Sequence, residues 1–158
     1  MRKQKGFSLI ELLIVVAIIL IIAAIAIPNL LRSRIAANEA SAVGSVRTIN
    51  TAEVTYAATY PEQGFTDLAL LGGTGTTATS DAALLLDQVL AAGTKSGYTF
   101  TAVASGGNPP TSPNVLYTVT ASPVVVDQTG KRYFFSDQSG VIRYNATGVA
   151  GAGDLALQ

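Results

Sequence analysis

The feature that most constrains this chain is an apolar run of 21 residues from Phe7 to Ile27, which only Ser8 and Glu11 interrupt. As an α-helix rising about 1.5 Å per residue, such a run is about 31 Å long, and the hydrocarbon core of a bilayer is about 30 Å thick. Basic residues flank it on both sides, at Arg2, Lys3, Lys5, Arg32 and Arg34. The N-terminal basic cluster is the closer and denser one, so the sequence predicts one membrane span with a cytoplasmic N-terminus and an exported remainder.

Glu11 is the unusual residue of this run, because a carboxylate in a membrane helix is costly. At the centre of a span the cost is roughly 2.5–3.5 kcal/mol, and it is lower near the interface, where Glu11 would lie. Ionisable residues in such segments are functional candidates with a partner to be found. The charge alone leaves a second interpretation open, in which the carboxylate reaches the headgroups or is protonated.

A secretory signal peptide is the competing interpretation of the same run. It would have an apolar stretch of about 7–15 residues that ends in a small-x-small cleavage site. Ala24-Ile25-Ala26 supplies that pattern, but the run is longer, contains a carboxylate and is followed closely by Pro28. These features favour a helix that the mature protein retains.

The residues around Glu11 resemble a known processing signal. Gly6-Phe7-Ser8-Leu9-Ile10-Glu11-Leu12 is similar to the cleavage and methylation signal of type IV pilins and of the pseudopilins of type II secretion. The resemblance extends from Lys5 to about Pro28, and it implies that a prepilin peptidase cuts between Gly6 and Phe7. It also implies that the new amino terminus of Phe7 is N-methylated. Without a side chain, Gly6 would let an intramembrane protease reach the backbone.

The resemblance further implies a role for Glu11, which becomes the fifth residue of the mature chain. In the family, this carboxylate pairs with the N-terminal amine of a neighbouring subunit during assembly. Opposite charges attract strongly in a medium of low dielectric constant, so one such pair can set the axial register of the subunits. Filament assembly would therefore account for a carboxylate in the apolar run.

Composition limits the remaining functions. The 158 residues suffice for one domain and its anchor. Residues 1–6 hold three of the ten basic residues and none of the ten acidic ones, so cleavage would leave a formal charge of −3 and no electrostatic footprint for nucleic acid. His, Cys and Trp are absent, which excludes Cys/His metal centres, thiol nucleophiles, disulfides and His-based catalysis. Asp127 and Asp137 supply too few oxygen ligands for calcium, so the sequence predicts no metal, no cofactor and no enzymatic activity.

Residues 28–60 are predicted to continue the helix beyond the membrane as an amphipathic half. Pro28 should kink or locally unwind the helix. Apolar residues recur mostly every three or four positions, at Ile35, Ala42, Val46, Ile49, Tyr56 and Tyr60. Glu39 and Glu53 fall on the same stripe and make it imperfect. Pro61 should end the helix, because the residue before a proline is disfavoured in the α region.

Residues 61–96 are predicted to form a connecting region with one short helix. Gly72–Thr77 indicates a flexible turn, and it lacks the Gly-Lys-Ser/Thr ending of a phosphate-binding loop. The predicted helix is Ala82–Ala92, capped by Ser80 or Asp81 and closed by Gly93. Its buried face would consist of Leu84, Leu85, Val89 and Leu90.

Residues 97–158 have a β pattern. Four strands are predicted, at Tyr98–Val103, Val115–Thr120, Lys131–Ser136 and Val141–Tyr144. Asp127–Gly130 and Asp137–Gly140 have Asp first and Gly fourth, which is typical of type I turns. An antiparallel meander with one face on the long helix gives an α+β fold that resembles the type IV pilin head. The Gly- and Ala-rich tail from Asn145 to Gln158 would be loose or would cover a neighbour. Many pilins close this region with a disulfide, whereas here packing and hydrogen bonds must hold it.

The sequence thus predicts a structural subunit that polymerises into a type IV pilus for adhesion, motility or DNA uptake. The alternative is a pseudopilin, which would form a short periplasmic filament that drives protein export. The resemblance implies four partners: other copies of the chain, a prepilin peptidase and N-methyltransferase, an inner-membrane platform protein and an assembly ATPase. The subunit would sit in the inner membrane before assembly. A membrane-anchored enzyme and a filament that conducts through stacked aromatics are less favoured, since no catalytic set is present and only 7% of residues are aromatic.

Overall fold

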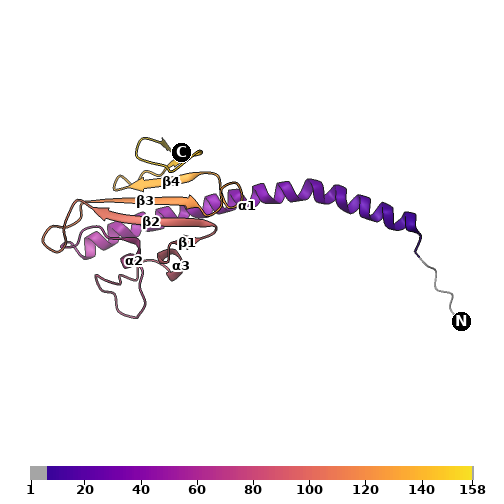
Figure 1. Cartoon of the computed structure of the whole chain (residues 1–158). Helices are drawn as coiled ribbons and strands as arrows, with labels where there is room; N and C mark the ends of the chain where they lie inside the picture. Colours follow the sequence, from indigo (N-terminus) through magenta and orange to yellow (C-terminus); the bar gives the residue numbers. More distant parts are fainter. Residues whose placement is uncertain (1–6, 158) are drawn as a thin grey trace. The chain divides into compact units, whose positions relative to one another are not determined.

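The computed structural model describes residues 7–157, and the chain divides into two compact units, Met1–Arg34 and Ile35–Gln158. The first helix, α1, spans Leu9–Thr59 and contributes to both units (Figure 1). It is helical throughout, Pro28 included, and a kink at that proline stays a prediction. We call the described part of the second unit the head, and every buried residue of the described chain belongs to it.

The head contains one antiparallel sheet of six strands, paired in the order in which they follow along the chain. The strands are β1 (Thr94–Lys95), β2 (Tyr98–Ser105), β3 (Leu116–Pro123), β4 (Tyr133–Asp137), β5 (Arg143–Asn145) and β6 (Leu155–Ala156). The meander and the α+β class are as predicted, but six strands replace the four expected. The two additional strands, β1 and β6, have two residues each, which is too short for an alternating pattern to reveal.

The predicted stripe on α1 is the side that packs on the sheet. Its buried members are Ile35, Ala42, Val46, Ile49 and Tyr56, while Tyr60 is half-buried. Except for Ile35, these residues join one core with the inward side chains of β2, β3 and β4, chiefly Tyr98, Phe100, Tyr117, Val119 and Phe134. Burial of each large apolar side chain is worth about 1.5–3 kcal/mol, which accounts for the attachment of the helix to the sheet. The helix ends at Thr59, just before Pro61, as predicted.

The connecting region contains two short helices, α2 (Leu68–Leu71) and α3 (Gln88–Ala91), and the predicted helix Ala82–Ala92 is wrong except for its last turn. The backbone N–H groups of residues 83–86 donate to carbonyls of residues 70–72 and not to their own helical partners. Leu84 accordingly has a φ of +55°.

The cap and the buried face of this short helix also differ from the prediction. Asp87, and neither Ser80 nor Asp81, caps α3, since its carboxylate accepts the Leu90 N–H at 3.0 Å. Leu90 is buried as expected, whereas Val89 is exposed.

Of the two predicted type I turns, only the second has the expected bonding. The Gly140 N–H donates to the Asp137 carbonyl at 2.9 Å, and the Asp137 carboxylate accepts the Ser139 N–H. In the first, Asp127 has a φ of +64°, and the turn begins two residues earlier, where the Val125 carbonyl accepts from Gln128.

The C-terminal tail is folded back on its own sheet. β6 pairs with β5, and the Leu157 N–H donates to the Ile142 carbonyl at 2.7 Å. The Asp154 carboxylate accepts from the Asn145 amide at 3.0 Å and from the Gly151 N–H at 2.8 Å. Hydrogen bonds thus close the loop between β5 and β6 in a chain that has no cysteine.

Candidate functional site

The predicted processing site lies at the edge of the described chain. Gly6 and the rest of the leader, residues 1–6, lie outside the described residues. Phe7 is 80% exposed, and α1 begins two residues later. Glu11 lies in the first turn of α1, where a negative charge interacts favourably with the helix dipole. Cleavage after Gly6 and methylation of Phe7 stay predictions.

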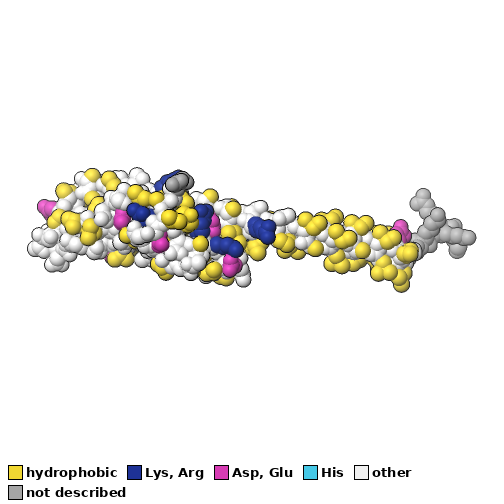
Figure 2. Space-filling model, turned by 90° about the horizontal axis from the view of Figure 1, so that it is seen from above, with side chains coloured by type: hydrophobic (Ala, Val, Ile, Leu, Met, Phe, Trp, Pro, Cys, Tyr) yellow, Lys and Arg dark blue, Asp and Glu magenta, His cyan; other side chains and the backbone are white. Residues whose placement is uncertain are grey.

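The first unit presents an apolar surface that nothing in the described chain covers. Every side chain from Phe7 to Arg34 is exposed, except for the half-buried Ala23. Figure 2 shows hydrophobic side chains covering this part of the helix on the face in view. The described residues contain one helix that is long and apolar enough to cross a membrane, and it is this one. A helix that is hydrophobic all round needs lipid or other helices around it.

Glu11 has no basic partner within ion-pair distance among residues 7–157. The three ion pairs of this part of the chain are all in the head, between Asp87 and Lys95, Asp127 and Lys131, and Glu39 and Arg132. A basic group that pairs with Glu11 would therefore come from the chain's own N-terminus or from another molecule.

Glu39, the first acidic residue on the stripe of α1, joins the helix to the two residues that precede β4. Its Oε1 accepts the backbone N–H groups of Lys131 at 2.9 Å and Arg132 at 3.1 Å, and its Oε2 accepts the Arg132 Nε at 2.8 Å. Burial alone would raise the pKa of Glu39, but these hydrogen bonds and the Arg132 charge hold the pKa below its ordinary value. The carboxylate is therefore a structural anchor within the head.

Glu53, the second acidic residue on the stripe, is fully buried beneath the connecting region. Its Oε2 accepts the Thr66 N–H at 3.1 Å, and its Oε1 has no hydrogen-bond partner among the described residues. Burial raises the pKa of Glu53 to about 7, and the nearby Asp67 charge acts in the same direction against the single N–H donor. Above about pH 7 the Glu53 side chain is therefore charged, and a charged carboxylate at this buried position destabilises the head.

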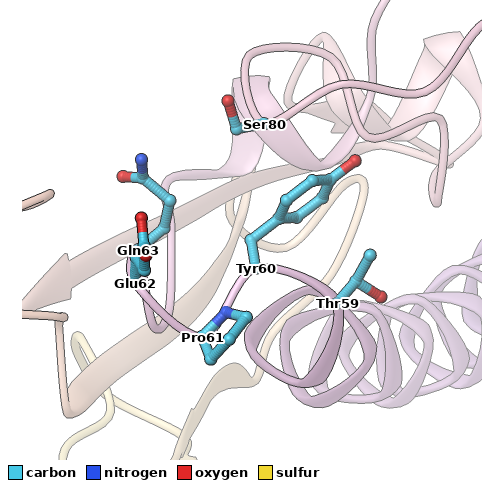
Figure 3. Close-up of a pocket in the computed structure, with 6 residues that line it drawn as sticks. All are labelled: Thr59, Tyr60, Pro61, Glu62, Gln63 and Ser80. Atoms are coloured by element: carbon cyan, nitrogen blue, oxygen red, sulfur yellow. The ribbon is translucent and has the colours of Figure 1, made fainter.

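A surface pocket lies where α1 ends, and its lining offers no catalytic set. The lining residues are Thr59, Tyr60, Pro61, Glu62, Gln63 and Ser80. In Figure 3 Ser80 lies above Tyr60 on a different segment, while Glu62 and Gln63 lie on the segment that follows Pro61. Glu62 is the single carboxylate of this pocket, and the described residues contain no group of three His, Cys, Asp or Glu side chains that could hold a metal ion.

Two features of the head were not foreseen from the sequence. The Asn38 amide donates to the Thr129 carbonyl at 2.8 Å and joins α1 to the loop after β3. The glycosylation-like triplet that begins at Asn145 is used internally, because the Asn145 amide donates to Asp154 and its carbonyl accepts both the N–H and the hydroxyl of Thr147. Neither residue type nor spacing signals such contacts between distant segments.

Comparisons with known proteins match parts of the chain. Residues 1–27 match the family model described as "Prokaryotic N-terminal methylation motif". The chain is similar to the "Type IV wide pilus major component PilA4" of Thermus thermophilus, with 67% identity over 39 residues, which are 25% of this chain and 30% of that protein. It is also similar to a "Fimbrial protein" of Pseudomonas aeruginosa, with 42% identity over 88 residues, which cover 48% of this chain and 57% of the relative.

A third relative is the "Type IV major pilin protein PilA" of Myxococcus xanthus, with 43% identity over 54 residues, which are 34% of this chain and 24% of that protein. The chain spans less than two thirds of the length of each of these relatives. No solved structure matches it significantly.

Proposed function

We propose that this chain is a member of the type IV pilin family and a structural subunit that polymerises into a pilus filament. Its N-terminal methylation motif and its similarity to pilins support this proposal. The observation that carries the proposal is the uncovered apolar length of α1, on which every large side chain from Phe7 to Leu31 is exposed. The relatives reported above are named as pilus or fimbrial components, which supports a pilus over the pseudopilus of a secretion system.

The same apolar surface serves two environments in turn. Before assembly, the segment Phe7–Ile27 holds the subunit in the inner membrane, with the N-terminus on the cytoplasmic side and the head exported. In the filament, helices of neighbouring subunits replace the lipid around it. Each Leu or Ile side chain kept from water contributes about 1.5–3 kcal/mol, so a bundle of these helices is strongly cohesive.

Pairing of Glu11 with a neighbouring subunit sets the axial position of each subunit in the bundle. Cleavage after Gly6 creates an amine on Phe7, four residues before Glu11 in the mature chain. A subunit that enters the bundle pairs this amine with the Glu11 carboxylate of a neighbour. Because a charge without a partner is costly in an apolar medium, subunits settle where the pair forms.

The proposal implies dedicated machinery. A prepilin peptidase that is also an N-methyltransferase processes the chain, and a platform protein and an ATPase at the inner membrane extract it into the growing filament.

Substitution of Glu11 tests the proposal directly. Glu11→Gln keeps the side-chain shape and removes the charge, so we expect normal membrane insertion and cleavage but at least a tenfold loss of filaments, measured by shearing and electron microscopy. The matched control is Glu62→Gln, which alters an exposed carboxylate of the head and should leave filaments unchanged. Filaments from Glu11→Gln at the level of the unaltered chain would contradict the assembly role.

A further inference from the structure

The loop between β3 and β4 presents three consecutive valines to solvent. Val124, Val125 and Val126 are 53, 41 and 50% exposed. We call the segment Val124–Gly130 the valine loop. Adjacent exposed apolar side chains are more often interaction surfaces than single ones are. None of these three side chains belongs to the hydrophobic core of the head.

Hydrogen bonds within the valine loop hold it in one shape. The Val125 N–H donates to the Thr129 hydroxyl at 3.1 Å, and the Val125 carbonyl accepts from the N–H groups of Gln128 at 3.2 Å and Thr129 at 2.9 Å. The Asp127 N–H donates to the Gly130 carbonyl at 3.0 Å. A side chain at Gly130 would clash with the Tyr98 ring, so the loop is also closely packed. A loop ordered in advance loses little conformational entropy when a partner covers it.

The valine loop is fixed to α1 at the start of the head. The Asn38 amide donates to the Thr129 carbonyl, and Glu39 accepts the backbone N–H groups that directly follow the loop. The long run of exposed large apolar residues at the start of α1 ends at Leu31, seven positions before Asn38 in the sequence. The valine loop therefore contacts α1 a few residues after the apolar run that the filament would bury.

The charges around the valine loop favour a protein partner over a lipid surface. Asp127 lies within the loop, and Lys131 beside it is paired with Asp127 at 3.1 Å. The next basic residue, Arg132, is paired with Glu39. Binding to anionic lipid headgroups relies on an excess of Lys and Arg, which these paired charges do not supply.

We propose that the valine loop docks on a second copy of this chain, as a contact between the heads of neighbouring subunits, and this inference rests on the proposed filament function. The contact is heterologous, because two valine loops placed face to face would bring two Asp127 carboxylates together. Contacts between different surfaces of the same subunit generate a helical filament where the rotation from one subunit to the next does not close into a ring. The valine loop thus adds a contact outside the helical bundle.

A charge placed in the loop tests the contact. Val125→Asp should reduce filament yield at least tenfold while the melting temperature of the detergent-solubilised full chain stays within about 2 °C of the unaltered chain. Val89→Asp is the matched control, since Val89 is a 57% exposed valine on α3, and it should assemble normally. Normal filaments from Val125→Asp, or an equal loss from both variants, would overturn the contact alone. Absence of filaments from the unaltered chain would overturn the filament function and this contact with it.

A cross-linking experiment identifies the partner even where assembly persists. The chain has no cysteine, so Val125→Cys introduces a single thiol that a maleimide-benzophenone probe can label. Irradiation of filaments should join two copies of this chain, with the second attachment outside the valine loop when peptides are mapped by mass spectrometry. Adducts to lipid or to a different protein alone, or attachments only between two valine loops, would overturn the proposal.

Discussion

Glu39 and Glu53 lie on the same buried side of α1, yet their surroundings differ in the number of donors. Glu39 receives two backbone N–H groups and a guanidinium, whereas Glu53 receives one N–H and leaves one oxygen without a partner among the described residues. The pKa values of the two residues are consequently shifted in opposite directions. At the scale of a residue, the number of hydrogen-bond donors around a buried carboxylate thus decides whether its charged form is favourable in the folded head.

Glu53→Gln should make the head more stable at pH 8 and remove one component of its pH dependence. Because burial raises the pKa of Glu53 from 4.5 to about 7, the folded chain binds this proton more tightly than the unfolded chain. The contribution of Glu53 to the free energy of unfolding is therefore fully present below about pH 4.5. It is lost as the pH rises through about 7. The gain at pH 8 is about 3 kcal/mol by linkage, and denaturant unfolding of the full chain in detergent measures it.

The exposed Glu62→Gln serves as the control for this substitution and should unfold like the unaltered chain at every pH. An equal or lower stability of Glu53→Gln at pH 8 would show that the carboxylate is not strained in the head.

Glu39→Gln should destabilise the head at pH 7 by about 1–3 kcal/mol, since hydrogen bonds to a charged group are the stronger kind. The contrast is Asp127→Asn, which removes an ion pair whose side chains are 63 and 68% exposed. Exposed pairs contribute about 0–1 kcal/mol, so this variant should unfold almost like the unaltered chain. Thermal unfolding of both variants compares the two pairs, and equal melting temperatures would contradict the anchoring role of Glu39.

At the scale of elements, the loop between β5 and β6 depends on a single carboxylate. Asp154→Ala removes the bonds to the Asn145 amide and the Gly151 N–H. We expect β6 to detach and residues 146–157 to exchange amide hydrogens and to be cut by protease at least tenfold faster, while β2 and β3 stay protected. Unchanged protection of the tail in the variant would mean that packing, and not Asp154, closes the loop.

The elements with a long, regular pattern were predicted correctly, and those that depend on distant contacts were not. α1 and the central strands follow from apolar spacing, and the end of α1 follows from Pro61. The segment Ala82–Ala92 has helical composition, but its backbone bonds to α2, which no local pattern reveals. The same holds for the functional residues. The motif at Gly6–Leu12 is continuous in the sequence and could be recognised from it, whereas the shape of the valine loop depends on its contacts with α1.

At the scale of the whole molecule, the chain has two parts. The head has its own buried core, whereas the apolar half of α1 has no buried residues. All buried residues of the described chain lie in Ile35–Gln158. We therefore expect a fragment of these residues to be folded and monomeric, with a single cooperative unfolding transition, and to form no filaments. Sedimentation and circular dichroism measure both properties. Filaments from the fragment would contradict the central role of the apolar helix.

The most direct test of the account is the intact mass and N-terminal sequence of the protein in a sheared filament fraction. We predict the loss of residues 1–6 and a new first residue, Phe7, that carries a methyl group on its amine. This result would establish that the apolar segment is kept for assembly. Cleavage after Ala26 would contradict the account, because it removes the helix that the filament requires and leaves a soluble exported head.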